Sequence, residues 1–433
     1  MIYPFSILSS LLSVLLSIGN GIILARLFDP SERGLIAQYM YIATFSSSAA
    51  VMLFVPYAIT KTVIASGLSN SAKPLTIIMG VQGAFSVAVV LIYVFLVARS
   101  PIETIAWVLI GFYALINVLY HGFSAMHRGL GNANLVSSTQ PTGVFLINML
   151  LLVGLAIPFT VLSVVGIYVF VNAALVALLL LRLGHDKGWR EDIMPTKIDR
   201  KDAFALSSVE LVLFVYNFAD KFVMSEFFNL HAFGLFALAS SMASVLFVLQ
   251  ASLSPILFMQ LARNSSDAKP YKVYADAVEK LHFLNLSLFA AAVILAVAGY
   301  FITPLLFGKA YAEVSVILPF LVFGYYCRSL SMVLDTGIRA SGHARVSTVI
   351  YIAGFVMFGC LTFGMLKFSS VDVNLIVPVA IAAAMATEFL LFCIHYHAHT
   401  NYSLFSLILI DTKSGIVAIR KLVLQLRMLI ERK

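Results

Sequence analysis

The stretch GIILARLFDPSERGLIA, from Gly21 to Ala37, places four charged residues within eight positions of a chain that is otherwise mostly apolar. A second stretch, KFVMSEFFNLHAFGLFA from Lys221 to Ala237, aligns with it without a gap. The identical pairs are Phe28 with Phe228, Gly34 with Gly234, Leu35 with Leu235, and Ala37 with Ala237. Four identities in seventeen positions can arise by chance, so they predict an internal repeat only if both halves of the chain share a layout.

Composition sets the class of protein. Of the 433 residues, 61% are hydrophobic and 11% are charged, whereas soluble domains carry roughly 25% charged residues. A soluble fold cannot bury so much apolar surface, so the sequence predicts an integral membrane protein. A bilayer core about 30 Å thick requires roughly 20 apolar residues for each spanning helix. Twelve apolar runs meet this requirement, at residues 4–28, 34–58, 75–98, 104–125, 135–158, 160–181, 203–228, 233–258, 281–302, 316–337, 347–366 and 374–395.

The basic residues predict the orientation of these helices, because loops rich in Lys and Arg stay on the cytoplasmic side. Most of the 28 basic residues fall in alternate loops that share a side with both chain ends. Both termini are therefore expected in the cytoplasm. The net charge of +8 follows from this topology and from contact with anionic lipids, and it gives no indication of nucleic-acid binding.

The longest polar stretch between the apolar runs, RLGHDKGWREDIMPTKIDRKD, has six predicted helices on each side. An even number of spans returns the chain to its starting side, so two six-helix lobes would be parallel repeats. We expect an N-terminal lobe at residues 1–183, a cytoplasmic linker at 184–202, a C-terminal lobe at 203–395 and a cytoplasmic basic tail at 396–433. The two repeated stretches would then close the first helix hairpin of each lobe.

Four segments of the chain resemble the Wzx-type polysaccharide flippases, which belong to the multidrug/oligosaccharidyl-lipid/polysaccharide exporter superfamily. The segments are ILARLFDPSERGLIA, ADKFVMSEFFNLHAFGLFALA, PLLFGKAYAEVSVILPFLVFGYY and GIRASGHARVST. The resemblance follows the whole chain in order and spacing, although its motifs are loose hydrophobic patterns. It implies two six-helix lobes around a central cavity in the bacterial inner membrane. It also implies alternating access and a polyprenyl-pyrophosphate-linked oligosaccharide as cargo, as in O-antigen, lipopolysaccharide or exopolysaccharide synthesis.

Polar side chains within the predicted helices are the candidate substrate contacts. Asn20 ends a stripe of serines along one face of the first helix. This stripe either lines a polar cavity or packs small residues between helices. In the seventh helix, Glu210, Asn217 and Lys221 share a face. Lys221 is a candidate ligand for an anionic group, and the alternative is that it lies at the outer membrane interface.

The tenth helix carries the strongest indication of a site. Tyr325, Arg328 and Asp335 share one face, and Arg328 falls near the predicted midplane of the bilayer. A charge at that depth costs about 2.5–3.5 kcal/mol on insertion scales, so it usually faces a wet cavity or a partner. The hypothesis is that Arg328 binds the pyrophosphate of the substrate. The alternative is a structural ion pair of Arg328 with Asp335 or with Glu388.

Three carboxylates inside the predicted helices are candidates for coupling transport to an ion. These are Glu388, Asp335 and Glu210. A desolvated carboxylate can load and release a proton, whereas a carboxylate beside polar helix atoms can hold Na⁺. The sequence leaves H⁺ and Na⁺ as alternatives.

The remaining features weigh against an enzyme. The longest predicted outer connection spans residues 303–315, which leaves little room for an active site, and the chain has no phosphate-binding glycine loop or HExxH motif. We expect no cofactor and no metal site. Embedded Arg328 and Lys221 favour an anionic head group over the organic cations of a multidrug exporter, which is the alternative function. The basic tail is expected on anionic lipids, or on a partner enzyme such as a polysaccharide polymerase or a glycosyltransferase.

Overall fold

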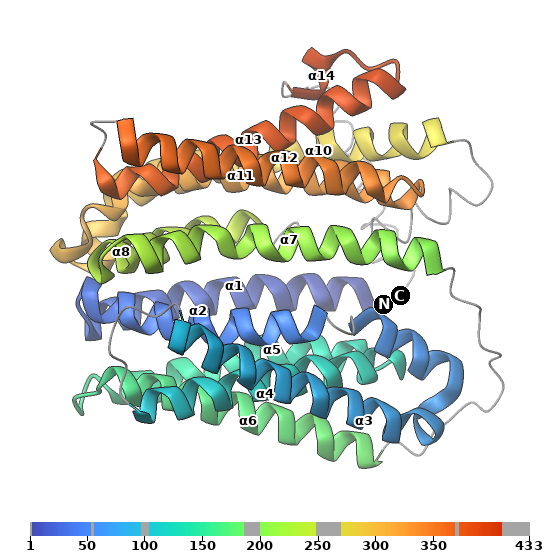
Figure 1. The fold of residues 1–433 in the computed structure, drawn as a ribbon. Coiled ribbons are helices and arrows are strands. Elements are labelled where there is room, and N and C mark those ends of the chain that lie inside the picture. Colours follow the sequence, from blue (N-terminus) through green and yellow to red (C-terminus); the bar gives the residue numbers. More distant parts are fainter. Residues whose placement is uncertain are drawn as a thin grey trace, which may run out of the picture. The chain divides into compact units, whose positions relative to one another are not determined.

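The computed structural model describes residues 2–52, 56–96, 104–185, 200–247, 270–368 and 372–408. Most of the linker predicted at 184–202 and of the tail predicted at 396–433 lies outside these residues. Every regular element within them is a helix (Figure 1). In the first half these are α1 (Ile2–Leu27), α2 (Pro30–Met52), α3 (Pro56–Leu96), α4 (Thr104–Gly129), α5 (Ala133–Val153) and α6 (Val161–His185). In the second half they are α7 (Arg200–Phe227), α8 (Leu230–Ala243), α10 (Pro270–Phe307), the 3₁₀ turn η1 (Lys309–Tyr311), α11 (Val314–Ala340), α12 (Ala344–Phe368), α13 (Val373–His399) and α14 (Leu404–Ile408).

Each of the twelve apolar runs overlaps one of these helices. Among the described residues, ten helices are long and apolar enough to cross a membrane, which confirms an all-helical membrane fold but leaves the count of twelve as a prediction. The two long helices outside this count are α1, whose apolar stretch covers Leu12–Leu27, and α7, which carries several charged residues.

The boundaries of α3 and α10 differ from the predicted loops. The second apolar run was expected to continue to residue 58, but α2 ends at Met52 and Pro56 begins α3. A proline fits the first position of a helix because its missing N–H has no partner there in any case. Helix α3 therefore extends 41 residues through a polar segment that hydropathy assigns to a loop. Helix α10 likewise starts at Pro270, ahead of its apolar run.

The chain divides into two compact units. Unit 1 contains residues 1–203, 217–238 and 306–311. Unit 2 contains residues 204–216, 239–305 and 312–433. The chain therefore passes between the units twice within α7, after residues 203 and 216, once within α8, after residue 238, and again after residues 305 and 311. The lobes at 1–183 and 203–395 remain a prediction.

In unit 1, α3 packs along α4, α1 packs along α5, and α6 contacts α4 and α5 (Figure 1). An apolar cluster joins α1, α2, α5 and α6 through Leu24, Ile36, Leu151 and Val164. In unit 2, α13 packs against both α11 and α12. Gly324 permits the close approach of α11 to α13, because a side chain there would overlap the backbone of α13 at Ala382.

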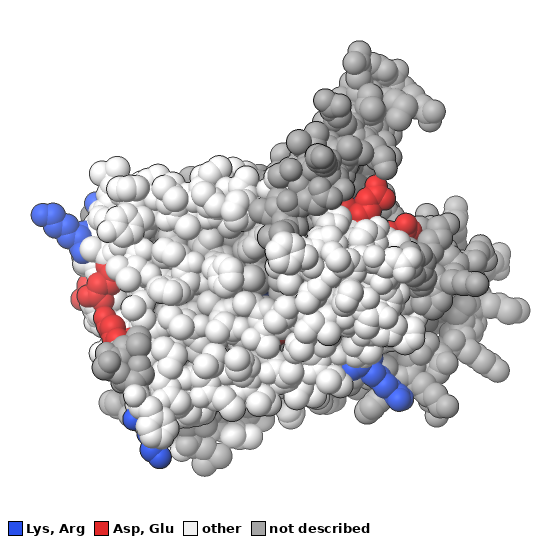
Figure 2. All heavy atoms as spheres, turned by 90° about the horizontal axis from the view of Figure 1, so that it is seen from above, with Lys and Arg blue, Asp and Glu red and all other residues white. Residues whose placement is uncertain are grey.

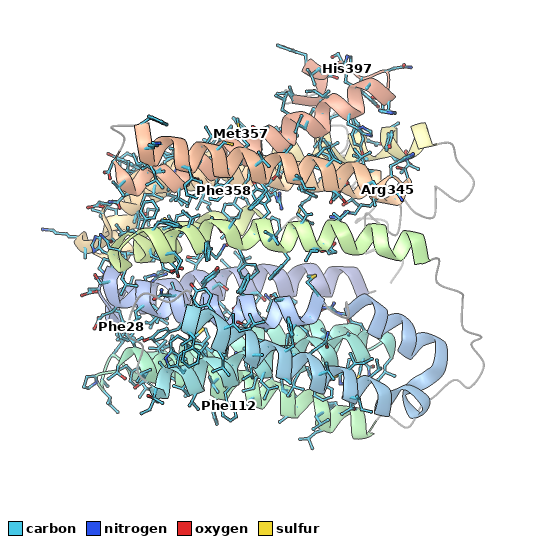
Figure 3. The ribbon with its side chains drawn as sticks, viewed as in Figure 1. Phe28, Phe112, Arg345, Met357, Phe358 and His397 are labelled. Atoms are coloured by element: carbon cyan, nitrogen blue, oxygen red, sulfur yellow. The ribbon has the colours of Figure 1, made fainter. Side chains whose placement is uncertain are left out.

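The outer faces of the helices are apolar, as contact with lipid requires. Figure 2 shows that most of the described surface in that view is uncharged. Phe112 on α4 is 55% exposed. On α12, labelled in Figure 3, Met357 is 37% exposed whereas its neighbour Phe358 is buried. Hydrophobic side chains thus occupy both the interior and the perimeter of these helices.

The repeated stretches have the same local structure. The Asp29 carboxylate accepts a hydrogen bond from the backbone N–H of Glu32 at 2.8 Å, and Glu32 accepts one from the N–H of Asp29 at 3.3 Å. Asn229, aligned with Asp29, accepts one from the N–H of Ala232 at 2.8 Å. Such side-chain caps satisfy N–H groups that a helix start leaves unpaired. Two of the four charges in the opening stretch therefore fix the start of α2.

Candidate functional site

The centre of unit 2 holds a buried ion pair between α11 and α13. Arg328 Nη1 donates to Glu388 Oε2, and both residues are at most 1% exposed. The guanidinium carbon lies 4.9 Å from the ring centroid of Tyr216 and 4.8 Å from that of Tyr351. Gly354 on α12 makes room for Glu388, because any side chain there would overlap the carboxylate. Of the alternatives drawn from the sequence, the Glu388 partner is the one that the structure contains.

A second charged network lies in the same unit. Arg339 Nη2 is 2.6 Å from Asp335 Oδ2, and Arg339 Nη1 is 2.6 Å from Glu210 Oε1. Asp335 therefore pairs with Arg339 one turn away on α11, and not with Arg328. The sequence reasoning missed Arg339, although the four-residue spacing to Asp335 is the usual spacing of a helical ion pair.

Two guanidinium groups and three carboxylates thus form two networks in unit 2. Fully ionised, the five groups carry one net negative charge. Buried atoms here also lack a hydrogen-bond partner among the described residues: Asp335 Oδ1, Glu388 Oε1 and the hydroxyls of Tyr351 and Ser347. The Glu210 side chain is 40% exposed, so the buried part of the two networks sets two guanidinium groups against two carboxylates.

Tyr325 occupies the same helix as Arg328, but it contacts a different element. Its hydroxyl is 3.0 Å from the Ser240 hydroxyl, and its ring lies edge-on to Phe247 at 6.5 Å between centroids. The side chain is only partly buried. An aromatic face with a neighbouring hydroxyl suits a sugar ring, and the assignment of Tyr325 to the substrate remains a prediction.

The remaining predicted substrate residues lie in unit 1. Lys221 Nζ is 3.2 Å from Asp220 Oδ1 and donates to the carbonyl oxygen of Asn217 at 3.1 Å. The Lys221 side chain is 33% exposed, so its charge remains partly accessible. The seventh helix therefore contributes Glu210 to unit 2 and the Asn217–Lys221 turn to unit 1.

Asn20 is the centre of a polar network in unit 1. Asn20 Nδ2 donates to Asn148 Oδ1 at 2.9 Å, and the Tyr168 hydroxyl donates to Asn20 Oδ1 at 2.8 Å. Asn148 also donates to the carbonyl oxygen of Leu16 at 2.8 Å. These partners lie 128 and 148 residues away in the sequence, which is why the serine stripe alone does not reveal them.

Two charged residues in unit 1 were not singled out from the sequence. Glu226, near the end of α7, is buried and accepts a hydrogen bond from the Tyr93 hydroxyl at 2.5 Å. Arg33, in the first turn of α2, is 6% exposed and donates to the carbonyl oxygen of Gly21 at 2.8 Å. The signal for Arg33 was its place among the four charges of the opening stretch.

The turn that connects α1 and α2 is held by the last turn of α10 and by the 3₁₀ turn η1. Arg26 donates to the carbonyl oxygen of Leu306 at 2.9 Å, and the Tyr311 hydroxyl donates to that of Phe28 at 3.0 Å. Burial raises the pKa of Tyr311 to about 12, so the phenol keeps the proton that this hydrogen bond needs at neutral pH. Phe28 is labelled in Figure 3 at the end of α1.

The aligned glycines of the two stretches contact each other directly. A side chain at Gly34 would overlap the carbonyl oxygen of Leu230, and one at Gly234 would overlap that of Pro30. Helices α2 and α8 therefore approach backbone to backbone within unit 1. The repeat detected in the sequence corresponds to a nearly symmetric contact in the structure.

A helical membrane protein with internal charge networks and a two-part architecture has the features of a membrane transporter. The sequence profile of the family described as "Polysaccharide biosynthesis protein" matches residues 23–316, and the chain belongs to this family. The family predicted from the sequence is confirmed. No curated protein matches the sequence.

Three solved structures show the same fold at low sequence identity. Lipid II flippase MurJ, in an inward closed conformation, has a TM-score of 0.63 and 14% identity over 96% of this chain and 91% of that chain. A MOP superfamily transporter from Pyrococcus furiosus has a TM-score of 0.59 and 14% identity over 93% and 96%. An inward-facing multidrug resistance MATE family transporter has a TM-score of 0.56 and 14% identity over 92% and 94%. The fold is thus that of the MOP superfamily.

Proposed function

We propose that this protein is an alternating-access flippase that moves a polyprenyl-pyrophosphate-linked oligosaccharide from the inner to the outer leaflet of the bacterial cytoplasmic membrane. The family match over residues 23–316 carries the proposal, and the shared fold with MurJ supports it. A flippase also meets a physical need, because sugar hydroxyls taken dry into hydrocarbon lose hydrogen bonds at a cost of several kcal/mol each. The head group requires a polar path while the polyprenyl chain stays in lipid.

The test uses the purified protein in vesicles that contain a fluorescent polyprenyl-pyrophosphate oligosaccharide in both leaflets. An impermeant quencher reaches only the outer leaflet at first, and flipping makes the remaining fluorescence accessible over time. We expect faster loss of fluorescence than in vesicles without protein. Unchanged quenching kinetics, together with export of an organic cation from the same vesicles, would instead support the multidrug exporter suggested by the MATE neighbours.

Within this function we assign the buried pair a coupling role. In the described conformation the Arg328 guanidinium forms an ion pair with the Glu388 carboxylate. A phosphate would have to compete with Glu388 for the same N–H donors. Protonation of Glu388 would release Arg328 to bind pyrophosphate in a bidentate fork. Binding of the ion and of the substrate would then be linked through one side chain.

Asp335, in the second network, is the residue with which we test the coupling role of a carboxylate. Asp335→Asn should stop gradient-driven flipping but allow insertion, because the amide can neither take up a proton nor hold a cation. A membrane potential supplies about 2.3 kcal/mol per charge per 100 mV, and that contribution would disappear. The measurement is flipping with and without an imposed gradient. Glu313→Gln is the matched control, since Glu313 is exposed and bonds only to Asn374 at 3.1 Å among the described side chains.

The proposed topology places both termini in the cytoplasm. In a variant without Cys327, Cys360 and Cys393, single cysteines at positions Thr196 and Lys309 should differ in reaction with an impermeant maleimide. Only Lys309→Cys should react from outside intact cells. Equal labelling at both positions would contradict the proposed arrangement of the spanning helices.

A further inference from the structure

Arg33 stands apart from the other buried arginines because it has no carboxylate partner. Arg328 and Arg339 both pair with acidic side chains. No described carboxylate forms an ion pair with Arg33. Its guanidinium donates to the Gly21 carbonyl oxygen, and the guanidinium carbon lies 5.9 Å from the centroid of the Tyr311 ring. A charge removed from water without a counter-charge is costly, so such a group is suited to bind an anion.

The nearest acidic residues along the chain are already engaged. Asp29 and Glu32 are exposed and bond to each other's backbone N–H groups in the helix cap. Their carboxylates therefore serve the start of α2. The charge of Arg33 remains for another partner.

Apolar side chains lie beside the Arg33 guanidinium next to Gly21. A Cβ at Gly21 would lie 3.7 Å from Arg33 Nη2, which is an ordinary van der Waals distance. The same point lies 3.8 Å from a methyl carbon of Leu238 and 3.9 Å from the ring of Phe307. Apolar walls strengthen the attraction between a guanidinium and an anion, since they exclude the water that would screen it.

Hydrogen-bonding groups lie beside this charge. Asn20 precedes Gly21 in α1, and its side-chain amide forms hydrogen bonds with the amide of Asn148 and with the hydroxyl of Tyr168. Tyr168 is also close enough to Arg33 to interact with it electrostatically. Asn20 and Tyr168 are only partly buried, so this network stays partly accessible. Phosphate oxygens and sugar hydroxyls are the groups that such a set of donors and acceptors can bind.

We propose that Arg33, with Asn20, Asn148 and Tyr168, forms a binding site for a phosphorylated sugar head group, and that Tyr311 covers this site in the described conformation. The cover depends on the hydrogen bond from Tyr311 to the Phe28 carbonyl oxygen. Arg328 belongs to unit 2 and is not a residue of this site. The identity of the ligand as substrate rests on the proposed flippase function, whereas the anion site itself does not.

The test measures binding of inorganic pyrophosphate to the full-length protein in discs of zwitterionic lipid by titration calorimetry. Arg33→Gln can still donate an amide hydrogen to the Gly21 carbonyl but lacks the charge, and we expect its affinity to fall roughly tenfold or more. Arg33→Lys should retain part of the affinity, because it keeps a charge but not the fork. Arg26→Gln is the matched control, since Arg26 also donates to a backbone carbonyl but is exposed. Unchanged pyrophosphate affinity in a folded Arg33→Gln protein would overturn the site.

A second variant tests the cover without altering the charge. Tyr311→Phe keeps the ring and loses one hydrogen bond worth about 1 kcal/mol, so pyrophosphate affinity should rise by about fivefold as the uncovered state becomes more populated. This variant also provides the test if Arg33→Gln does not fold. Pyrophosphate affinity equal to that of the unaltered protein would exclude the covered site.

Two further titrations identify the source of the phosphate. A soluble short-chain polyprenyl pyrophosphate should compete with inorganic pyrophosphate, whereas phosphatidylglycerol added to the discs should not. Equal competition by phosphatidylglycerol would assign the site to a membrane lipid and would overturn the substrate assignment. Loss of flipping in the vesicle assay with normal pyrophosphate binding would count against the proposed function alone.

Discussion

Glu388→Gln should lower the free energy of unfolding by about 3–5 kcal/mol, because it leaves the buried guanidinium of Arg328 without a counter-charge. Replacing both partners by apolar residues of similar size, Arg328→Met with Glu388→Leu, should recover most of that stability, since no buried charge then remains. Thermal unfolding in detergent, monitored by circular dichroism, measures both changes. Arg345→Met is the control: Arg345 is an exposed arginine at the start of α12 (Figure 3), and its removal should change stability by no more than about 0.5 kcal/mol.

The same variants separate a structural pair from a substrate ligand. If Arg328 binds pyrophosphate after Glu388 releases it, the stable double variant will remain unable to flip lipid-linked oligosaccharide. Arg328→Lys should keep a fraction of the activity through its charge. Wild-type flipping by the double variant would show that the pair only holds α11 against α13, and Arg328 would leave the substrate site. The double variant pairs Arg328 with Glu388 because these two residues form the ion pair, whereas Asp335 pairs with Arg339.

Gly34→Ala and Gly234→Ala should each reduce flipping by at least roughly tenfold and lower the free energy of unfolding by about 1–3 kcal/mol, as overpacking does. In both variants the new methyl group would overlap a backbone carbonyl on the facing helix. Backbone atoms cannot rotate away as a flexible side chain can, so α2 and α8 would have to separate. Flipping in vesicles and thermal unfolding measure the two effects.

Gly111→Ala is the matched control for this pair. A Cβ at Gly111, in the middle of α4, would meet nothing within 4 Å, and alanine favours a helix over glycine by about 1 kcal/mol. Gly111→Ala should therefore leave flipping unchanged. If the Gly34→Ala and Gly111→Ala variants had the same flipping rate and the same free energy of unfolding, the close contact between α2 and α8 would not be needed for function.

Hydropathy was enough to predict the helices, because membrane thickness sets both their length and their composition. It failed at the boundaries: α3 begins at Pro56, inside the second predicted apolar run, and continues through a polar segment. A helix can extend beyond the membrane without an apolar sequence. The burial of Arg328 could also be predicted, because a residue at the centre of a long apolar run lies deep in the membrane.

Pairing between distant residues was much less predictable. The contact between Arg328 and Glu388 was one of two alternatives, and the four-residue spacing that links Asp335 to Arg339 went unused. Nothing local indicates that Asn20 meets Asn148, because that contact depends on how α1 packs on α5. The repeat showed that Gly34 and Gly234 are equivalent, but equivalent positions in two halves need not touch.

The course of the chain through α7 and α8 has a consequence for dividing the protein into fragments. Unit 1 includes residues 217–238 and 306–311 in addition to residues 1–203. A polypeptide that ended at Ala203 would lack Leu230 and Gly234, which pack on Gly34, and Tyr311, which bonds to Phe28. The shortest continuous polypeptide that includes all of unit 1 therefore extends to Tyr311, so a split gene cut at the polar linker would not encode two self-sufficient halves.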